Sequence, residues 1–247
     1  SYCKGHSSIV LTIVRTYMPL CGASELSRCF PACLQSIYLT RSGSAADVIT
    51  IAGYASLMDE ASARETTPEL RNWRYGYVDG FARVFDLVSI VNIRKGLAKD
   101  PYLVTCTARP RKGCRLRVCL YDVPAVSFPG LEARERRLAT STVHVLQDDG
   151  RSCEARLFTQ YSDERYRAER ANTPEKWHDE VGQYYAGGTI YRTDCLPVPS
   201  YLRRCLEAYR AVGHEANFLD NTFLGDGCTS IREYVKRQGA SALELPG

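Results

Sequence analysis

The chain has 247 residues, of which 45% are apolar and 24% charged, with 18 glycines and 11 prolines. Such a chain can bury a full hydrophobic core, and its composition excludes collagen-like, coiled-coil and disordered proteins. The uncharged run at residues 48–58 is much shorter than the roughly 20 apolar residues of a spanning helix, so we predict no association with a membrane.

The formal net charge of +4 is concentrated near the N-terminus. Residues 1–46 contain four basic side chains and one acidic one, which leaves 28 basic and 27 acidic side chains in the remaining 201 residues. These opposite charges are interleaved, whereas a nucleic-acid-binding domain usually carries a basic stripe on its folded part. We therefore predict that nucleic acid is not the partner, and protein partners stay open.

The eleven cysteines favour neither a metal site nor a disulfide framework. No Cys-x-x-Cys pair occurs and the four histidines lie apart, so the spacing predicts no zinc site. Cysteines inside apolar stretches such as residues 117–120 are typical of reduced, buried thiols. The sequence therefore predicts an intracellular, reducing compartment.

Residues 1–46, the first segment of the chain, are rich in Ser, Cys and Leu and poor in acidic residues. This composition resembles an organelle transit peptide or a disordered N-terminal segment. A helix around residues 9–20 that packs on the domain is the alternative. A transit peptide would direct the protein to a plastid or a mitochondrion, and we place the folded domain at residues 47–247.

From residue 47 onward, short β-branched runs alternate with turn signals at residues 95–96, 111–113 and 148–150. Apolar spacing predicts a helix over residues 202–212, and a capping box of Ser230 and Glu233 begins another that ends at Gly239. The pattern indicates a mixed α and β fold with a compact sheet or barrel. The six predicted strands are residues 48–52, 81–91, 102–108, 115–121, 141–146 and 153–161.

The first segment with possible chemistry is residues 51–58, Ile-Ala-Gly-Tyr-Ala-Ser-Leu-Met. An apolar strand here runs into small residues and then into a polar stretch. Backbone N–H groups at such a strand exit can hold a carboxylate or a developing oxyanion. An ordinary strand-to-helix turn is the alternative.

The second such segment is residues 129–138, in which Glu132 and Glu135 are one helical turn apart and are predicted to share a face. The glutamate nearer the following strand could point into a cavity and have a raised pKa, as a general base requires. A solvated ion-pair face is the alternative, because arginines surround both carboxylates.

Together, and in this order, these segments resemble the γ-glutamylcyclotransferase-like superfamily, which includes the ChaC-like and AIG2-like proteins. Residues 53–57 resemble its Tyr-Gly-Ser-Leu loop, and residues 80–85, Gly-Phe-Ala-Arg-Val-Phe, resemble the start of its next strand. Residues 131–135 resemble the segment that carries its catalytic glutamate. The resemblance covers residues 47–238, and the segments at 199–205, 217–224 and 231–234 are similar to the C-terminal helices of uncharacterised plant and algal members.

The resemblance implies a small mixed β-barrel of about six strands with flanking helices. It implies an enzyme that cyclises a γ-glutamyl group to 5-oxoproline and releases an amine or amino acid, without a metal or redox cofactor. Glu135 would be the general acid and base, with Glu132 as the alternative. The backbone of Tyr54, Ala55, Ser56 and Leu57 would bind the glutamyl end of the substrate.

One position departs from the family pattern, because the family has Gly where this chain has Ala55. The added methyl group either crowds the substrate or requires a negative φ at a position where glycine was free to differ. The alternative function is therefore that of a catalytically inactive member of the same fold that acts as a binding or assembly module. Glutathione, γ-glutamyl amino acids and γ-glutamyl amines all stay open as substrates.

Overall fold

The computed structural model describes residues 47–184 and 188–244. Residues 1–46 lie outside this part, so the transit-peptide prediction and its alternative, a helix at residues 9–20, stay predictions.

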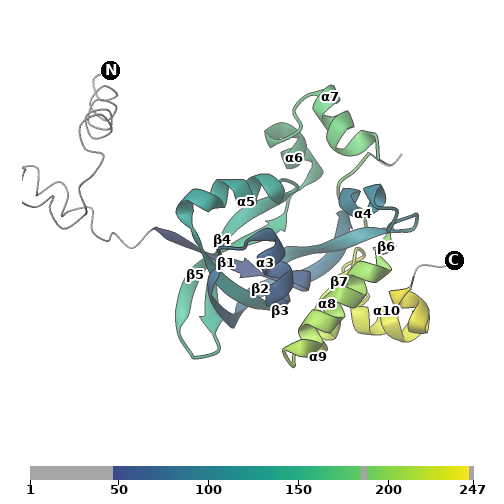
Figure 1. The fold of residues 1–247 in the computed structure, drawn as a ribbon. Helices are drawn as coiled ribbons and strands as arrows, with labels where there is room; N and C mark the ends of the chain where they lie inside the picture. Colours follow the sequence, from purple (N-terminus) through teal and green to yellow (C-terminus); the bar gives the residue numbers. More distant parts are fainter. Residues whose placement is uncertain (1–46, 185–187, 245–247) are drawn as a thin grey trace, which may run out of the picture. The chain divides into compact units, whose positions relative to one another are not determined.

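The strands of the described part form one seven-stranded sheet in the order β6-β3-β1-β5-β4-β2-β7. Strand β3 also pairs with β2, and this pairing closes β3, β1, β5, β4 and β2 into a five-stranded barrel (Figure 1). Strand β1 is antiparallel to β3 and parallel to β5, so the barrel is mixed and the predicted fold class is confirmed. The strands are β1 (Val48–Gly53), β2 (Arg71–Val88), β3 (Tyr102–Pro124), β4 (Leu138–Gln147), β5 (Ser152–Gln160), β6 (Leu196–Pro197) and β7 (Thr222–Leu224).

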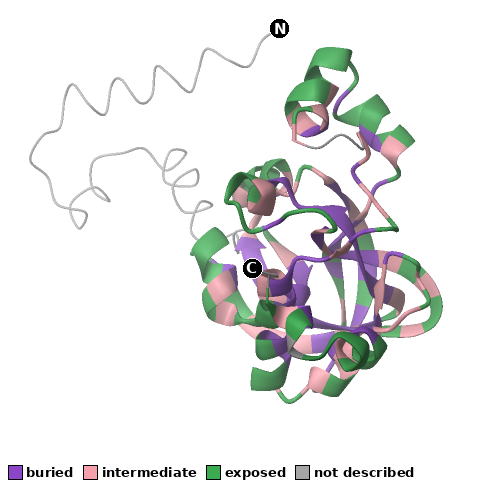
Figure 2. Cartoon of the chain, turned by 90° about the vertical axis from the view of Figure 1, so that its right-hand side faces the viewer, coloured by how far each residue is buried: buried purple, intermediate pink, exposed green. Residues whose placement is uncertain are grey.

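Short helices flank the barrel, and Figure 2 shows buried residues on the strands and exposed residues on the outer faces of the helices. The longest, α8, turns its apolar stripe inward, burying Leu202, Cys205, Leu206 and Tyr209. The helices are α3 (Glu60–Thr66), α4 (Ile90–Arg94), α5 (Phe128–Arg134), α6 (Asp163–Glu169), α7 (Pro174–Trp177), α8 (Pro199–Ala211), α9 (Glu215–Asp220) and α10 (Ile231–Gln238). Single turns of 3₁₀-helix lie at η2 (Ala55–Met58), η3 (Ala125–Ser127) and η5 (Gly239–Leu243), and η4 (His178–Gly182) is a π-helical turn.

The predicted strand over residues 81–91 is wrong at both ends. Strand β2 begins ten residues earlier, because Trp73, Tyr75 and Tyr77 alternate along it and the two tyrosines pair with β3. It ends at Val88, since Ser89 caps α4 by accepting a hydrogen bond from the N–H of Asn92 at 3.4 Å.

The predicted strands at residues 102–108 and 115–121 are one strand, β3, so the predicted turn at residues 111–113 is also wrong. The register places Phe81 opposite Pro110 and Asp79 opposite Arg115. Residues 111–114 therefore form a bulge opposite Gly80, where both Gly80 and Gly113 have positive φ. Residues 111–114 are therefore not paired with β2, but strand β3 continues on both sides of them.

Three other local predictions are confirmed. Strands β4 and β5 form an antiparallel hairpin whose turn contains Gly150 with φ 82°. Helix α8 is followed by Gly213 with φ 73°, and α10 begins with the complete capping box of Ser230 and Glu233.

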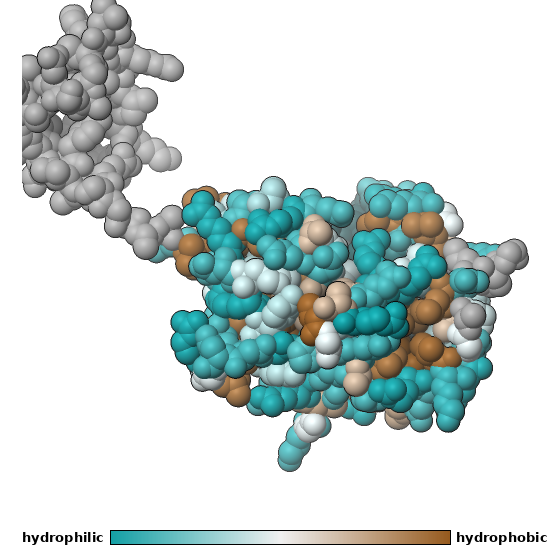
Figure 3. All heavy atoms as spheres, turned by 60° about the horizontal axis from the view of Figure 1, so that its bottom comes forward, coloured by the Kyte–Doolittle hydropathy of each residue, from teal (hydrophilic) through white to brown (hydrophobic). Residues whose placement is uncertain are grey.

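The surface is mostly hydrophilic, and Figure 3 shows apolar patches between polar side chains on one face. Within the described residues, no helix is long and apolar enough to cross a membrane. The described cysteines are free thiols.

Candidate functional site

The turn that follows β1 is closely packed against β3 and β5. A Cβ atom on Gly53 would lie 2.7 Å from Cys119 Sγ and 3.3 Å from Tyr121 Cε1, so only glycine fits there. The Tyr54 hydroxyl is buried and donates a hydrogen bond to the carbonyl of Phe158 in β5 at 2.8 Å. These contacts fix where the backbone leaves the barrel.

Ala55 occupies the left-handed region with φ 56°, so the expected negative φ is wrong. A non-glycine residue adopts this conformation only where its surroundings hold it. The residue is 1% exposed, so protein covers its methyl group and little of it is left to meet a substrate. The alanine therefore keeps a backbone conformation that glycine adopts readily.

The next two residues of the turn are engaged by the protein itself. Burial raises the pKa values of Cys205 and Tyr201 on α8, while the Ser56 backbone acts to lower that of Cys205 and the Ser56 side chain that of Tyr201, so Ser56 lies next to this helix. The Leu57 N–H donates to the Tyr54 carbonyl at 3.1 Å, and the Leu57 carbonyl accepts from Cys119 Sγ at 3.1 Å. Helix α8 therefore covers one side of this turn.

Glu135 follows the last residue of α5, where the chain turns toward β4. Its N–H donates to the Leu131 carbonyl at 3.0 Å, and its carbonyl accepts from the N–H of Leu138 at 2.7 Å. Both backbone groups are thus fixed, while the side chain is 35% exposed. A carboxylate held in this way can meet a ligand without a change in the backbone.

Burial raises the pKa of Glu135 above that of an ordinary glutamate, although the nearby guanidinium groups of Arg134 and Arg137 act to lower it. The Glu135 charge in turn contributes to the raised pKa values of Tyr54 and Tyr121, where burial is the main cause. The Glu135 charge therefore acts on Tyr54, the first residue of the predicted turn.

Glu132 has different polar contacts from Glu135. Its Oε1 accepts a hydrogen bond from the hydroxyl of Thr140 in β4 at 2.8 Å. Glu135 follows the last residue of α5, and its carboxylate lies near the guanidinium group of Arg134. Of the two carboxylates, Glu135 is the one whose charge acts on Tyr54.

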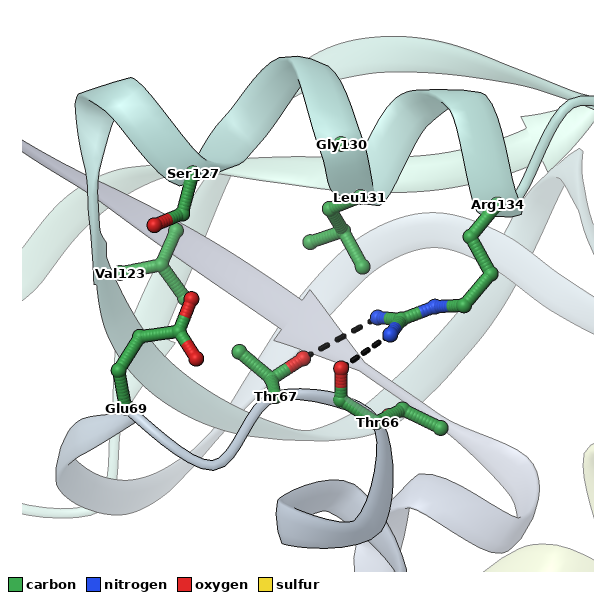
Figure 4. Close-up of a pocket in the computed structure, with 8 residues that line it drawn as sticks. All are labelled: Thr66, Thr67, Glu69, Val123, Ser127, Gly130, Leu131 and Arg134. Atoms are coloured by element: carbon green, nitrogen blue, oxygen red, sulfur yellow. Dashed lines mark hydrogen bonds between the residues drawn. The ribbon is translucent and has the colours of Figure 1, made fainter.

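A shallow cavity of about 200 Å³ lies between the end of α3 and helix α5 (Figure 4). Arg134 reaches across it to the Thr66 carbonyl and to the Thr67 hydroxyl, the latter at 3.2 Å, while Glu69 lies on the far side. The Arg134 Nε atom is also 4.0 Å from Glu135 Oε1. Glu135 adjoins this cavity but does not line it, and neither do residues 54–57.

The arginines around Glu135 are evident from the sequence, but Tyr121 is not evident as its neighbour, because the sequence shows this tyrosine only as part of a strand. The position of Tyr121 depends on the pairing of β1 with β3, which places it opposite Ile51. In the part of the chain that the structure describes, no cluster of three or more His, Cys, Asp or Glu side chains could hold a metal ion.

Comparisons with known proteins give fold-level similarity only. No protein-family model matches the sequence, and no curated protein matches it. A solved γ-glutamyl cyclotransferase is similar with a TM-score of 0.47 and 11% identity over 68% of this chain and 81% of that chain. An uncharacterised human protein has a TM-score of 0.47 and 11% identity over 67% and 80% of the two chains.

A yeast γ-glutamyl cyclotransferase described as specific to glutathione has a TM-score of 0.42 and 14% identity, over 66% of this chain and 87% of that one. The small mixed barrel that the sequence resemblance implies is present. The chain resembles the γ-glutamylcyclotransferase-like superfamily in the order of its motifs and in its barrel.

Proposed function

We propose that this protein cyclises a γ-glutamyl group to 5-oxoproline and releases an amine or amino acid, with Glu135 as the general acid and base. The observation that supports the proposal is that Glu135 is a partly exposed carboxylate with a raised pKa whose charge acts on Tyr54, the residue that follows β1. A carboxylate whose pKa is raised toward neutral pH is a better base than an ordinary one.

The reaction needs one group that moves a proton twice. The α-amine of the γ-glutamyl group attacks its own γ-carbonyl carbon, and Glu135 accepts the proton that the amine loses as the new C–N bond forms. Glu135 then returns that proton to the leaving nitrogen as the original C–N bond breaks, so the carboxylate is regenerated. Binding that holds the γ-glutamyl group of the substrate in the geometry of ring closure supplies a large part of the rate acceleration.

The left-handed backbone at Ala55 supports retention of the turn, since the substituted residue keeps a conformation open to glycine. A substrate would meet the turn on the side away from α8, because Ser56 lies next to Tyr201 and Cys205 of that helix. The proposal covers any amine or amino acid as the leaving group.

The second candidate is a binding or assembly module that has kept the fold and lost the reaction. The hydrogen bond from the Leu57 N–H to the Tyr54 carbonyl favours it, because that amide is then not available to a substrate. The two candidates differ in whether Glu135 performs proton transfer.

The test measures 5-oxoproline release from glutathione, a γ-glutamyl amino acid and a γ-glutamyl amine. We expect wild type to convert one of them and Glu135→Gln to lose at least about 100-fold in rate, the usual contribution of general acid–base catalysis. Glu132→Gln is the matched control, since it alters a carboxylate on the same helix that bonds to Thr140.

Full activity in Glu135→Gln would remove the assigned base. Inactivity of folded wild type on all three compounds would favour the binding module.

A further inference from the structure

A second cavity, of about 470 Å³, lies against β2 and β3 and shares no lining residue with the first. Its volume is within the range of sites that hold small molecules. Pro110 and the edge of Val84 supply an apolar floor above the buried Ala82, while Thr193 and the turn at residues 225–227 form the opposite wall. The cavity therefore offers one apolar surface and one polar rim.

Arg109 lines this cavity and is held from beneath by a buried carboxylate. Its Nη1 atom is 3.3 Å from Asp86 Oδ2, and the Asp86 side chain is only 1% exposed, whereas that of Arg109 is 39% exposed. The guanidinium group thus has a fixed inner edge and an accessible outer edge. A fixed guanidinium loses less conformational entropy when it binds an anion.

Arg111 lies two residues further along β3 and is held by different contacts. It donates a hydrogen bond to the Gly227 carbonyl, and its guanidinium carbon lies 3.8 Å from the centroid of the Phe223 ring. Stacking on an aromatic ring holds the planar group while leaving other N–H donors at its edge. Two oriented guanidinium groups therefore share one cavity.

The wall opposite the arginines is closely packed. A Cβ atom on Gly225 would lie 2.7 Å from Thr193 Cα, so the two backbone segments are in direct contact. Asp226 also lines the cavity, but its carboxylate oxygens accept hydrogen bonds from the N–H groups of Cys228 and Thr229 and from the Thr229 hydroxyl. Its charge is thus directed into its own turn.

We propose that this cavity binds a small anionic molecule, whose phosphate or carboxylate group is held by Arg109 and Arg111 and whose apolar part lies on Pro110 and the adjacent edge of Val84. Guanidinium groups recognise both kinds of anion through paired N–H donors. The site is independent of the proposed cyclisation, because none of its lining residues is among those assigned to Glu135 or the β1 turn.

Anion binding at this site is linked to protonation of Asp86. The groups that face this carboxylate are Thr107 and Arg109 from β3, Gln160 from β5 and Tyr191. Burial raises the pKa of Asp86 to about 6. Below that pH the carboxyl is neutral, Arg109 loses its counter-charge, and the cavity attracts an anion more strongly.

Calorimetric titration of the full chain with inorganic phosphate and with succinate tests the proposal and separates the two chemistries. We expect one saturable site for at least one probe, and Arg109→Gln and Arg111→Gln should each weaken its binding by about tenfold or more. Thr193→Glu, which adds a negative charge at the exposed rim of the cavity, should also weaken anion binding without altering the core. Arg115→Gln, which removes an exposed arginine of β3 outside the cavity, is the matched control and should bind as wild type does.

Sulfate serves as the pH probe because it is a dianion at both pH 5 and pH 7. Tighter sulfate binding at pH 5 in wild type, and no such change in Asp86→Asn, is the expected result. The proposal would be overturned if neither phosphate nor succinate showed saturable binding up to about 10 mM. A dissociation constant above that concentration corresponds to a binding free energy weaker than about −3 kcal/mol. Equal binding by wild type, Arg109→Gln and Arg111→Gln would overturn it as well.

Discussion

Ala55 shows that a departure from a sequence motif can leave the backbone conformation available to glycine in place. Its left-handed φ of 56° costs on the order of 1 kcal/mol for a residue with a Cβ atom. Burial of the methyl group, of a size worth about 0.8 kcal/mol, offsets much of that cost. The sequence identified the position, but the sign of φ depends on contacts with distant strands.

Asp86 is predicted to make stability depend on pH in an unusual direction. Its folded pKa of about 6 lies above the ordinary value of 3.8, so the folded protein binds this proton more tightly than the unfolded chain does. Its contribution therefore lowers stability as pH rises from about 4 to about 6. We expect the free energy of unfolding of wild type, relative to that of Asp86→Asn, to fall by about 2 kcal/mol between pH 4.5 and pH 7.

Urea unfolding of both proteins at several pH values measures this difference, and subtraction removes the contributions of other carboxyl groups. Asp194→Asn is a useful control, because the exposed Asp194 carboxylate has a lowered pKa. Its contribution to the free energy of unfolding should therefore change with pH in the opposite direction. A constant difference between wild type and Asp86→Asn across this range would contradict the assignment.

At the scale of elements, local patterns predicted the pieces that depend on neighbours in sequence. The capping box at Ser230 and the hairpin around Gly150 are examples, since both are made by residues within a few positions of each other. The length of β2 and β3 was missed, because the bulge opposite Gly80 looks like a turn until the partner strand is known. Pairing between strands thus decides where these elements end.

Arg83 joins the C-terminal elements to the barrel and is 0% exposed. Its Nε donates to Thr222 in β7 at 2.7 Å, its Nη1 to the Tyr209 hydroxyl in α8 at 2.8 Å, and its Nη2 to the Asn217 carbonyl in α9 at 2.9 Å. The guanidinium group also lies 5.2 Å from the ring centroid of Phe218. One side chain of β2 thus satisfies acceptors from three other elements.

Arg83→Met should lower the free energy of unfolding by about 3–5 kcal/mol, since several buried acceptors lose their donor at once. Urea unfolding measures the loss, and amide exchange should become faster in α8 and α9 than in the β4–β5 hairpin. Arg232→Met is the control: this exposed arginine pairs with Asp220, and its replacement should cost less than about 1 kcal/mol. Equal losses in the two variants would show that Arg83 does not connect these elements.

At the scale of the whole domain, closure of the barrel creates the candidate site. Tyr54 follows β1 and Glu135 precedes β4, and these two strands lie on either side of β5. No periodicity in the sequence indicates this order, because it depends on contacts between residues about 80 positions apart. The motif resemblance identified both segments, whereas their proximity follows from the sheet.

The seam between β2 and β4 is as short as the β1–β5 pairing of the closed barrel, with Gly76 opposite Gln147 and Tyr77 opposite Leu146. A Cβ atom on Gly76 would lie 2.7 Å from the Leu146 carbonyl oxygen and 2.8 Å from Val145 Cγ1. Backbone atoms cannot move aside as a flexible side chain can. A methyl group there should therefore push the two strands apart.

Gly76→Ala should reduce the free energy of unfolding by about 1–3 kcal/mol, the usual cost of overpacking. Gly130→Ala adds the same methyl group to α5 where no atom lies within 4 Å, and it should leave stability unchanged or raise it by up to about 1 kcal/mol. Urea unfolding compares the two variants, and amide exchange at Asp148, whose N–H donates to the Tyr75 carbonyl, reports on the seam itself. If Gly76→Ala were as stable as Gly130→Ala and amide exchange at Asp148 were unchanged, close packing at the β2–β4 seam would not be required for barrel closure.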